Sequence, residues 1–279
     1  MTIFLGVDGG GTGCRVAVAD ARGRILGRAT GGPANINTDV RGAAENILDA
    51  TRIALAGSGI APQSLVATLG LAGGTMQQAI RELTARLPFA RVQVVNDGVT
   101  AARGALGTDD GILAAMGTGS VFARQLGGRI LQVGGRGFLM GDEGSAAVLG
   151  RALLARAMQA ADGFVPMTQL LAALLDKMGG TVGIIAFGNH ATPGDFGAFA
   201  PRVTDADDPA AVAIREAALD QVRHIIATLQ AGRSLPVVFV GGLGAHYAAG
   251  LAGLWPQRAP RGDAVDGALL MARQMDPPG

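Results

Sequence analysis

Thiols are almost missing from this sequence of 279 residues, which contains one cysteine, Cys14. A single thiol excludes an internal disulfide and a cysteine-rich metal cluster held by one chain. Lysine is equally scarce, because every Lys or Arg position except Lys177 is an arginine. No Gly-Lys pair occurs, which excludes a P-loop, since that loop needs Gly-Lys-Ser/Thr. Any phosphate site must therefore use backbone N–H groups, hydroxyls and a metal ion.

Long apolar runs and an excess of charge are also missing. No run approaches the length of a membrane span, and Asp8 interrupts the first apolar stretch, which makes a signal peptide a poor interpretation. The formal net charge of +1 gives no electrostatic signature for nucleic acid or an acidic membrane surface. Hydrophobic residues make up 49% and charged residues 16%, which argues against disorder, and the length suits two domains. These features predict a cytoplasmic α/β protein with neither a nucleic-acid nor a membrane partner.

Glycine, by contrast, is abundant, with 45 residues, and its first cluster follows an apolar strand. The run GVDGGGTG places Asp8 and three consecutive glycines at the end of that strand. The next stretches, CRVAVAD and ILGRAT, have the alternation of strands. The opening residues therefore predict a strand–turn–strand–turn–strand meander. A dinucleotide-binding GxGxxG turn opens a helix instead, which argues against a Rossmann fold.

The meander pattern occurs twice in the chain. After the first copy, periodicity predicts helix, strand, helix, strand and helix in the order 39–57, 65–73, 75–87, 91–97 and 99–106. The second copy has strands at 111–116, 121–126 and 129–133, with a glycine turn at 117–120. Further helices are predicted at 145–161, 209–232 and 263–274, with an apolar strand at 236–242. We interpret this as an internally duplicated α/β protein with a hinge near residues 106–110.

Two glycine-rich turns, one in each half, together predict a phosphate site. Backbone N–H groups at such turns form concave anion sites, and Thr12 and Thr118 add hydroxyl donors. Asp8 would repel a phosphate unless a cation lay between them, and Mg²⁺, held through water, suits that position. Either turn alone is also compatible with a plain hairpin. The pair predicts two turns that face each other across a cleft and clasp one triphosphate.

Three of these segments resemble motifs of a known superfamily. DGGGT (8–12), MGTGS (116–120) and VVFVGGL (237–243) are similar to the two phosphate motifs and the adenosine motif of actin, heat-shock chaperones and sugar kinases. Within that superfamily the chain resembles the BadF/BadG/BcrA/BcrD-type ATPases, and most of all their N-acetylglucosamine and glucosamine kinases. The stretches that carry this resemblance are GPANINTD (32–39), GLAGG (70–74), VVNDGVTAA (94–102), GGRGFLMGDEGSAAVLGR (134–151) and GDAVDGALLMA (262–272).

The resemblance implies a fold and a domain division. The fold class is α/β, with two duplicated ribonuclease-H-like (actin-like ATPase) domains, each a five-stranded mixed sheet with helices, separated by a ligand cleft. The N-terminal domain would comprise residues 1–106 plus 263–279, and the C-terminal domain residues 107–262. A homodimer is common among related kinases, and the residues of this chain leave that option open.

The resemblance also implies ATP and Mg²⁺ as cofactors and assigns site residues. Nucleotide binding falls on Gly9, Gly10, Gly11, Thr12, Gly117, Thr118, Gly119, Ser120, Gly241, Gly242 and Ala245, and the metal on Asp8. Binding of a small amino-sugar substrate falls on Asn35, Gly73, Asp97, Gly135, Arg136 and Asp142. Many relatives have tryptophan where this chain has Arg136, so the preference at the 2-position of the sugar is open. A guanidinium there would disfavour a protonated amine and favour the N-acetyl sugar.

Three of the proposed sugar ligands also have ordinary structural interpretations. Asp97 follows an apolar strand and precedes a helix, so it could bind a ligand at the strand end or cap the helix. Asp142 suits the first turn of a helix, and Asn35 suits a turn after Pro33. The resemblance implies that Asp97 accepts the proton of the attacking sugar hydroxyl and that Asp142 and Asn35 bind sugar hydroxyls.

The predicted activity is ATP-dependent transfer of the γ-phosphoryl group to the 6-hydroxyl of N-acetylglucosamine or glucosamine. One alternative is a dehydratase-activating ATPase of the same family, but its iron–sulfur cluster needs more thiolates than Cys14 supplies. The other is a nucleotide-driven switch without a sugar substrate, for which the GDEGS segment (141–145) would have no purpose.

Overall fold

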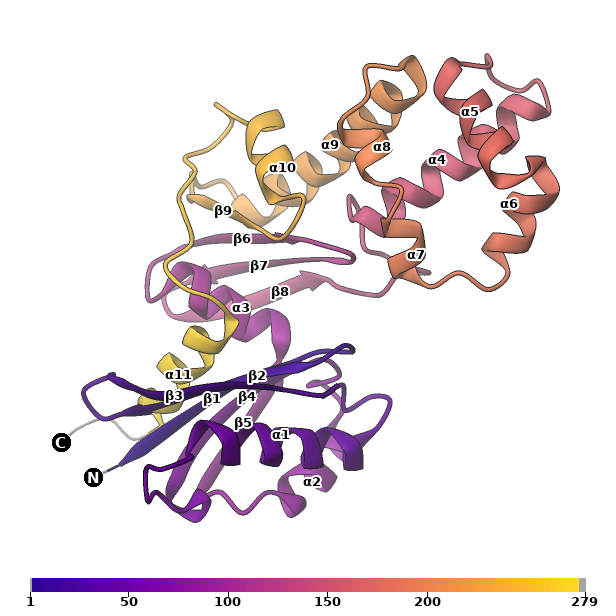
Figure 1. Ribbon diagram of the computed structural model, residues 1–279. Helices are drawn as coiled ribbons and strands as arrows, with labels where there is room; N and C mark the ends of the chain where they lie inside the picture. The colour runs from indigo at the N-terminus through magenta and orange to yellow at the C-terminus, as the bar shows by residue number, and fades with distance from the viewer. Residues whose placement is uncertain (1, 276–279) are drawn as a thin grey trace. The chain divides into compact units, whose positions relative to one another are not determined.

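The computed structural model describes residues 2–275, which divide into two compact units (Figure 1). The described residues of the first unit are 2–113, 123–132 and 259–275, and those of the second unit are 114–122 and 133–258. The described part of the chain contains two sheets, one of five strands and one of four, together with helices. The predicted α/β class is confirmed.

The first sheet is mixed, as predicted. Its strands are β1 (Ile3–Gly9), β2 (Cys14–Asp20), β3 (Ile25–Gly31), β4 (Leu65–Leu71) and β5 (Arg91–Asn96). Their order is β3-β2-β1-β4-β5, with antiparallel pairing in the meander and parallel pairing of β1 with β4 and of β4 with β5. Because β1, β4 and β5 are parallel, the segments that follow them leave the same edge of the sheet, where α/β proteins bind ligands.

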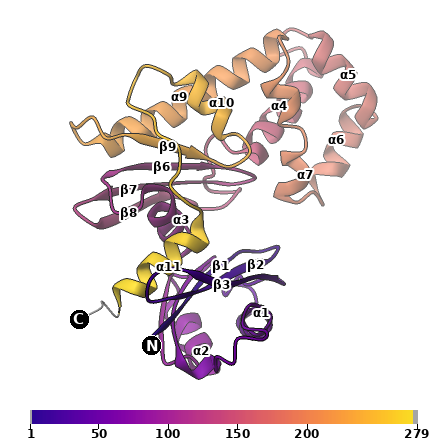
Figure 2. The ribbon, with the colours of Figure 1, turned by 60° about the vertical axis from the view of Figure 1, so that its left-hand side comes forward.

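Helices cover both faces of this sheet (Figure 2). Leu5 and Val7 of β1 pack in a core with residues of α1 (Val40–Ala54) and α2 (Gln77–Arg86). Phe4, whose side chain points to the opposite face, packs with residues of α11 (Ala264–Gln274). This alternation along β1 is the period of a strand that is covered on both sides.

Glycines allow α11 to lie directly against α3 (Asp97–Leu106). A Cβ atom at Gly104 would lie 1.8 Å from the carbonyl oxygen of Asp263, and one at Gly267 would lie 2.0 Å from that of Thr100. Both distances are far below van der Waals contact, and both involve backbone atoms that a side-chain rotation cannot move. The helix that carries Asp97 at its first position is therefore held by α11, although 157 residues separate the two helices along the chain.

We expect Gly267→Val to destabilise the protein by about 3 kcal/mol or more, because the added side chain must separate two packed helices. Thermal unfolding measures this change. Gly188→Val is a matched control, because a Cβ atom there meets no atom within 4 Å. Equal melting temperatures for the two variants would show that the α3–α11 contact is not tight.

The second sheet contains four strands among the described residues, so the prediction of five is wrong. The strands β6 (Gly111–Met116), β7 (Ser120–Leu126), β8 (Arg129–Gly134) and β9 (Val237–Val240) lie in the order β8-β7-β6-β9. Beyond β9 only a single bridge joins Val237 to Gln257. Pro256 and Pro260 flank this bridge, and a proline cannot donate a backbone hydrogen bond to a neighbouring strand.

Helices make up most of the remaining second unit. They are α4 (Ala146–Ala161), α5 (Gln169–Met178), α6 (Gly180–Gly188), α7 (Pro193–Gly197), α8 (Pro201–Thr204), α9 (Pro209–Gln230) and α10 (Gly244–Gly250). The helix α4 contacts α5, α7 and α9. Within residues 2–275, no single helix is both long and apolar enough to cross a membrane, and the bent pair α5–α6 meets that test only when its two helices are taken together.

Candidate functional site

The first glycine turn joins β1 to β2 and is anchored to two neighbouring loops. The N–H of Gly10 donates to the carbonyl of Gly13 at 2.9 Å, which closes the turn. Ala34 donates to the carbonyl of Gly10, and Ala72 to that of Gly9, each at 2.9 Å. The turn therefore lies beside the loops that contain the predicted ligands Asn35 and Gly73.

Three backbone donors of this turn have no hydrogen-bond partner among the described residues. Among residues 2–275, the N–H groups of Gly11, Thr12 and Gly13 make no hydrogen bond, and Gly11 and Thr12 are exposed. Neither Gly10 nor Gly11 has a positive φ, and a Cβ atom at either would meet no atom within 4 Å. Neither backbone strain nor packing thus explains these two glycines. A ligand that approaches the backbone closely would explain both the free donors and the missing side chains.

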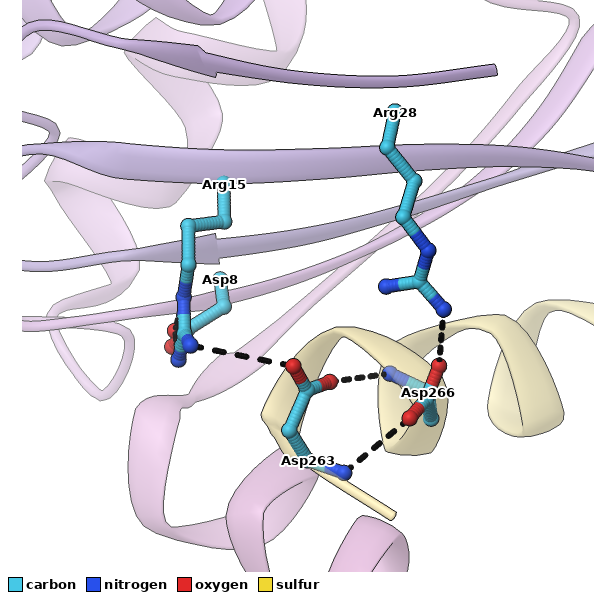
Figure 3. Close-up of polar contacts among 5 residues, drawn as sticks. All are labelled: Asp8, Arg15, Arg28, Asp263 and Asp266. Carbon is cyan, nitrogen blue, oxygen red and sulfur yellow. Dashed lines mark hydrogen bonds and ion pairs between the residues drawn. The ribbon is translucent and has the colours of Figure 1, made fainter.

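Asp8 forms an ion pair that the sequence analysis missed (Figure 3). Arg15 lies directly opposite Asp8 in the β1–β2 register, and its Nε and Nη2 atoms contact Oδ2 of Asp8 at 3.1 and 2.5 Å. Arg15 also lies 3.7 Å from Asp263 at the start of α11, where Arg28 pairs with Asp266 at 2.6 Å. The Asp8–Arg15 pair could have been predicted from the sequence, because the position of the turn fixes which residues of the hairpin lie opposite each other.

The donor set around Asp8 fits Mg²⁺ bound mainly by phosphates and water. Among the described residues, no group of three or more His, Cys, Asp or Glu side chains could hold a metal by itself. Mg²⁺ in nucleotide sites commonly takes one or two carboxylates and fills its other positions with water and phosphate oxygens. Asp8 supplies one such carboxylate, and its side chain is 19% exposed, so water can reach it.

Asp97 is the first residue of α3, directly after β5. The N-cap residue is Asn96, whose side chain accepts a hydrogen bond from the N–H of Gly98 at 3.1 Å, and the Asp97 carboxylate accepts from the same N–H at 2.9 Å. Burial raises the pKa of the Asp97 carboxyl, and the negative charge of Asp8 raises it further, whereas the N–H of Gly98 acts in the opposite direction. A half-buried carboxylate with a raised pKa is a better proton acceptor than an ordinary aspartate.

Asn35 and Gly73 lie beside each other at the same sheet edge. The Oδ1 atom of Asn35 accepts from the N–H of Asn37 at 2.9 Å, which is the Asx turn expected after a proline. Gly73 has a φ of 84°, and a Cβ atom there would lie 2.8 Å from the backbone nitrogen of Asn37. The chain's own geometry therefore requires glycine at position 73, whatever the residue binds.

The second glycine turn belongs to the second unit and is bonded to the start of α4. Gly117 donates to the carbonyl of Gly119 at 2.9 Å. Ala146 and Ala147 donate to the carbonyls of Gly117 and Thr118 at 2.9 and 3.2 Å. A further bond links the hydroxyl of Ser120 to the carbonyl of Glu143 at 2.8 Å. These bonds hold the turn and the GDEGS segment in one rigid arrangement.

Asp142 of that segment lies against the second glycine turn. Backbone N–H groups of Ser120 and Gly137 donate to its carboxylate, and a Cβ atom at Gly119 would lie 2.8 Å from its Oδ2 atom. The residue is only 7% exposed. Burial raises the pKa of the Asp142 carboxyl, although the two N–H donors favour its ionised form.

The predicted nucleotide residues after β9 reach the same turn. Gly241 has a φ of 88°, and a Cβ atom there would lie 2.5 Å from the carbonyl oxygen of Met116. The same carbonyl accepts from the N–H of Leu243 at 2.9 Å. Gly242 resembles Gly11, because it has no positive φ and open space around its missing Cβ atom. Ala245 follows in the first turn of α10.

Arg136 borders a pocket that the sequence did not indicate, and Gly135 precedes it in the chain. Gly135 donates to the carbonyl of Ser120 at 3.1 Å, which places it beside the second turn. The pocket has a volume of about 310 Å³ and lies within the second unit. Its polar lining residues are Arg136, Glu143, His224 and Thr228. No local pattern in α9 marks His224 as a pocket residue, because only tertiary packing brings that helix to this loop.

Comparisons with known proteins agree with the resemblance seen in the sequence. The sequence profile of the BadF/BadG/BcrA/BcrD ATPase family matches residues 5–251. The glucosamine kinase GspK of Vibrio cholerae is 29% identical, over 98% of this chain and 96% of its own length. An N-acetylmuramic acid/N-acetylglucosamine kinase of Clostridium acetobutylicum is 29% identical, over 63% of this chain and 60% of its own. A crystal structure of a candidate N-acetylglucosamine kinase from Chromobacterium violaceum is 32% identical and has a TM-score of 0.84, with 98% and 99% of the two chains covered.

Proposed function

Because the chain belongs to the BadF/BadG/BcrA/BcrD ATPase family, we propose that it is an ATP-dependent amino-sugar kinase. The reaction would transfer the γ-phosphoryl group to the 6-hydroxyl of N-acetylglucosamine or glucosamine. The amino-sugar kinases among its relatives support this substrate class, and two of them align over nearly the whole chain.

The observation that carries the nucleotide part of the proposal is the set of glycines without a structural reason. At Gly10, Gly11 and Gly242 the backbone is ordinary and the space of the missing side chain is open. All three lie in the segments predicted to contact ATP. Side chains there would be compatible with the protein alone but would block the approach of phosphates, ribose or adenine.

Phosphoryl transfer needs little covalent chemistry from the protein, so the proposed roles are binding, orientation and proton transfer. The free N–H groups of Gly11, Thr12 and Gly13 would bind phosphate oxygens of ATP. Asp8 would hold Mg²⁺ through water, and the metal, when bound, neutralises charge on the phosphates. Asp142 would orient the sugar by accepting hydrogen bonds from its hydroxyls.

The chemical step would begin at Asp97. Its carboxylate accepts the proton of the sugar 6-hydroxyl as the oxygen of that hydroxyl forms a bond to the γ-phosphorus. The bond from the γ-phosphorus to the bridging oxygen breaks, and ADP leaves with that oxygen. The products are a sugar 6-phosphate, ADP and the proton taken up by Asp97.

A coupled ADP-release assay over a panel of hexoses and amino sugars tests this function. We expect sugar-dependent ADP release with N-acetylglucosamine or glucosamine and much less with glucose. Arg136 beside the sugar loop favours the N-acetyl sugar over the protonated amine. ADP release that is independent of every sugar would overturn the kinase proposal and favour a nucleotide-driven switch.

The pH profile should reflect the raised pKa of Asp97. The base must be ionised to accept a proton, so kcat should fall as the pH decreases through that pKa. Because burial and Asp8 raise it, the acid limb should lie above the ordinary aspartate value of about 3.9. Stopped-time assays over a pH series, with stability checked at each pH, measure this limb. An activity that stays constant down to pH values near the ordinary pKa would contradict the assignment.

A further inference from the structure

Tyr247 is a buried hydrogen-bond donor next to the GDEGS segment. It is the only tyrosine of the sequence, lies on α10 and is 0% exposed. Its hydroxyl donates to the carbonyl of Gly144 at 2.6 Å, across 103 positions of the chain. Burial raises the pKa of the phenol, so the hydroxyl keeps its proton and remains a donor near neutral pH.

The carbonyl that accepts this bond lies in a strained segment. Gly144 has a φ of 73° and Asp142 a φ of 59°. Among residues 2–275, Asp142 and Ala231 are the only non-glycine residues with positive φ. An L-residue in this region persists only where its surroundings hold it there.

The surroundings hold the segment from two sides. On one side, the second glycine turn bonds the Glu143 carbonyl and the Asp142 carboxylate through Ser120. On the other side, Tyr247 bonds the Gly144 carbonyl, and a Cβ atom at Gly144 would lie 2.8 Å from the Tyr247 hydroxyl. Without the hydroxyl, the segment would keep its contacts with Ser120 and the bond from the N–H of Ser145 to the carbonyl of Asp142 at 3.0 Å, but the Gly144 carbonyl would lose the bond from Tyr247.

The helix that carries Tyr247 has anchors of its own. The N–H of Leu243, just before α10, donates to the carbonyl of Met116 at 2.9 Å, and the close approach of Gly241 fixes the preceding turn. The aromatic ring of Tyr247 is buried independently of its hydroxyl. Loss of the hydroxyl should therefore leave α10 and the predicted nucleotide residues in place while releasing Gly144.

We propose that Tyr247 is a positioning residue for the sugar site, which holds Asp142 in its left-handed conformation through the Gly144 carbonyl. This inference rests on the proposed function, because it takes Asp142 as the sugar ligand. Under this proposal α10 would have two roles, because it also carries the predicted nucleotide residue Ala245. The bond links the segment after β9 to the sugar loop within one unit.

Kinetics of Tyr247→Phe test the inference. We expect the KM for the sugar to rise about tenfold while the KM for ATP stays within twofold. A sugar KM within twofold of the wild-type value, or an equal rise of both KM values, would overturn it. Gln230→Met is the matched control, because it also removes buried hydrogen bonds, those between Gln230 and Leu235 at 3.0 and 2.7 Å. This control should lower the melting temperature and change neither KM value.

A second measurement does not depend on the folding of the variant. Since Tyr247 is the only tyrosine, 3-fluorotyrosine labelling places a single ¹⁹F probe in the protein. Its resonance should shift when N-acetylglucosamine is added at a concentration that saturates turnover, and an unchanged resonance in an active enzyme would overturn the inference. Failure of the wild-type protein to phosphorylate any sugar would instead refute the proposed function, so the two failures are distinguishable.

Discussion

Asp97→Asn should lower the rate of phosphoryl transfer about 10³-fold and leave the affinity for ATP within twofold. The amide has almost the same size as the carboxylate but cannot accept the proton of the attacking hydroxyl. Asp97 is the first residue of α3, and its neighbour Asn96 caps the helix. The amide oxygen of asparagine can still accept the bond that the Asp97 carboxylate accepts from the N–H of Gly98 at 2.9 Å, so we expect the helix to form in the variant. Single-turnover kinetics measure the transfer, and calorimetry with a non-hydrolysable ATP analogue measures the binding.

Asn96→Asp is the matched control for this variant. It changes the adjacent residue by the reverse substitution and keeps a side chain that caps helices well. We expect it to retain most of the activity and of the thermal stability. Substantial transfer by Asp97→Asn would place the base elsewhere, and loss of ATP binding in that variant would assign Asp97 to the nucleotide site.

The strands and turns of this chain could be predicted because their signals are local. Alternating apolar residues mark the meander of β1–β3, and the glycine turns interrupt it where the strands end. Helix α3 begins at Asp97 rather than at the predicted position 99, because the side chain of Asn96 caps the helix directly after β5. The second sheet has four strands among the described residues instead of the predicted five, and beyond β9 it has only the bridge from Val237 to Gln257, beside which Pro256 and Pro260 have no N–H to donate.

The features of the candidate site that the sequence did not predict depend on contacts between segments that are distant along the chain. The pair Asp8–Arg15 could have been derived, because the hairpin register follows from the turn. The bond from Tyr247 to Gly144 could not, because it joins a helix to a loop 103 positions away. No local preference predicts the positive φ of Asp142 either, since only the hydrogen bonds around it make that conformation favourable. Sequence patterns therefore locate the candidate ligands, whereas tertiary contacts fix their orientation.

Asp142→Gly should raise the KM for the sugar about 100-fold with a modest effect on stability. If Asp142 binds the sugar as proposed, removal of the carboxylate eliminates its charge-assisted hydrogen bonds to the sugar hydroxyls, and two such bonds would account for a change of that size. Glycine also adopts the φ of 59° at this position without strain, which offsets part of the cost of losing the bonds to Ser120 and Gly137.

The matched comparison is Asp142→Ala, which removes the same carboxylate but keeps a Cβ atom in the left-handed region. Both variants should lose sugar affinity to the same extent, whereas the alanine variant should be less stable by about 1 kcal/mol. Sugar KM values and chemical denaturation measure the two quantities separately. If Asp142→Gly kept the wild-type KM for the sugar while Asp142→Ala raised it, the backbone conformation at position 142, rather than the carboxylate, would determine sugar binding. If alanine and glycine were equally stable, the left-handed backbone at Asp142 would not be strained in solution.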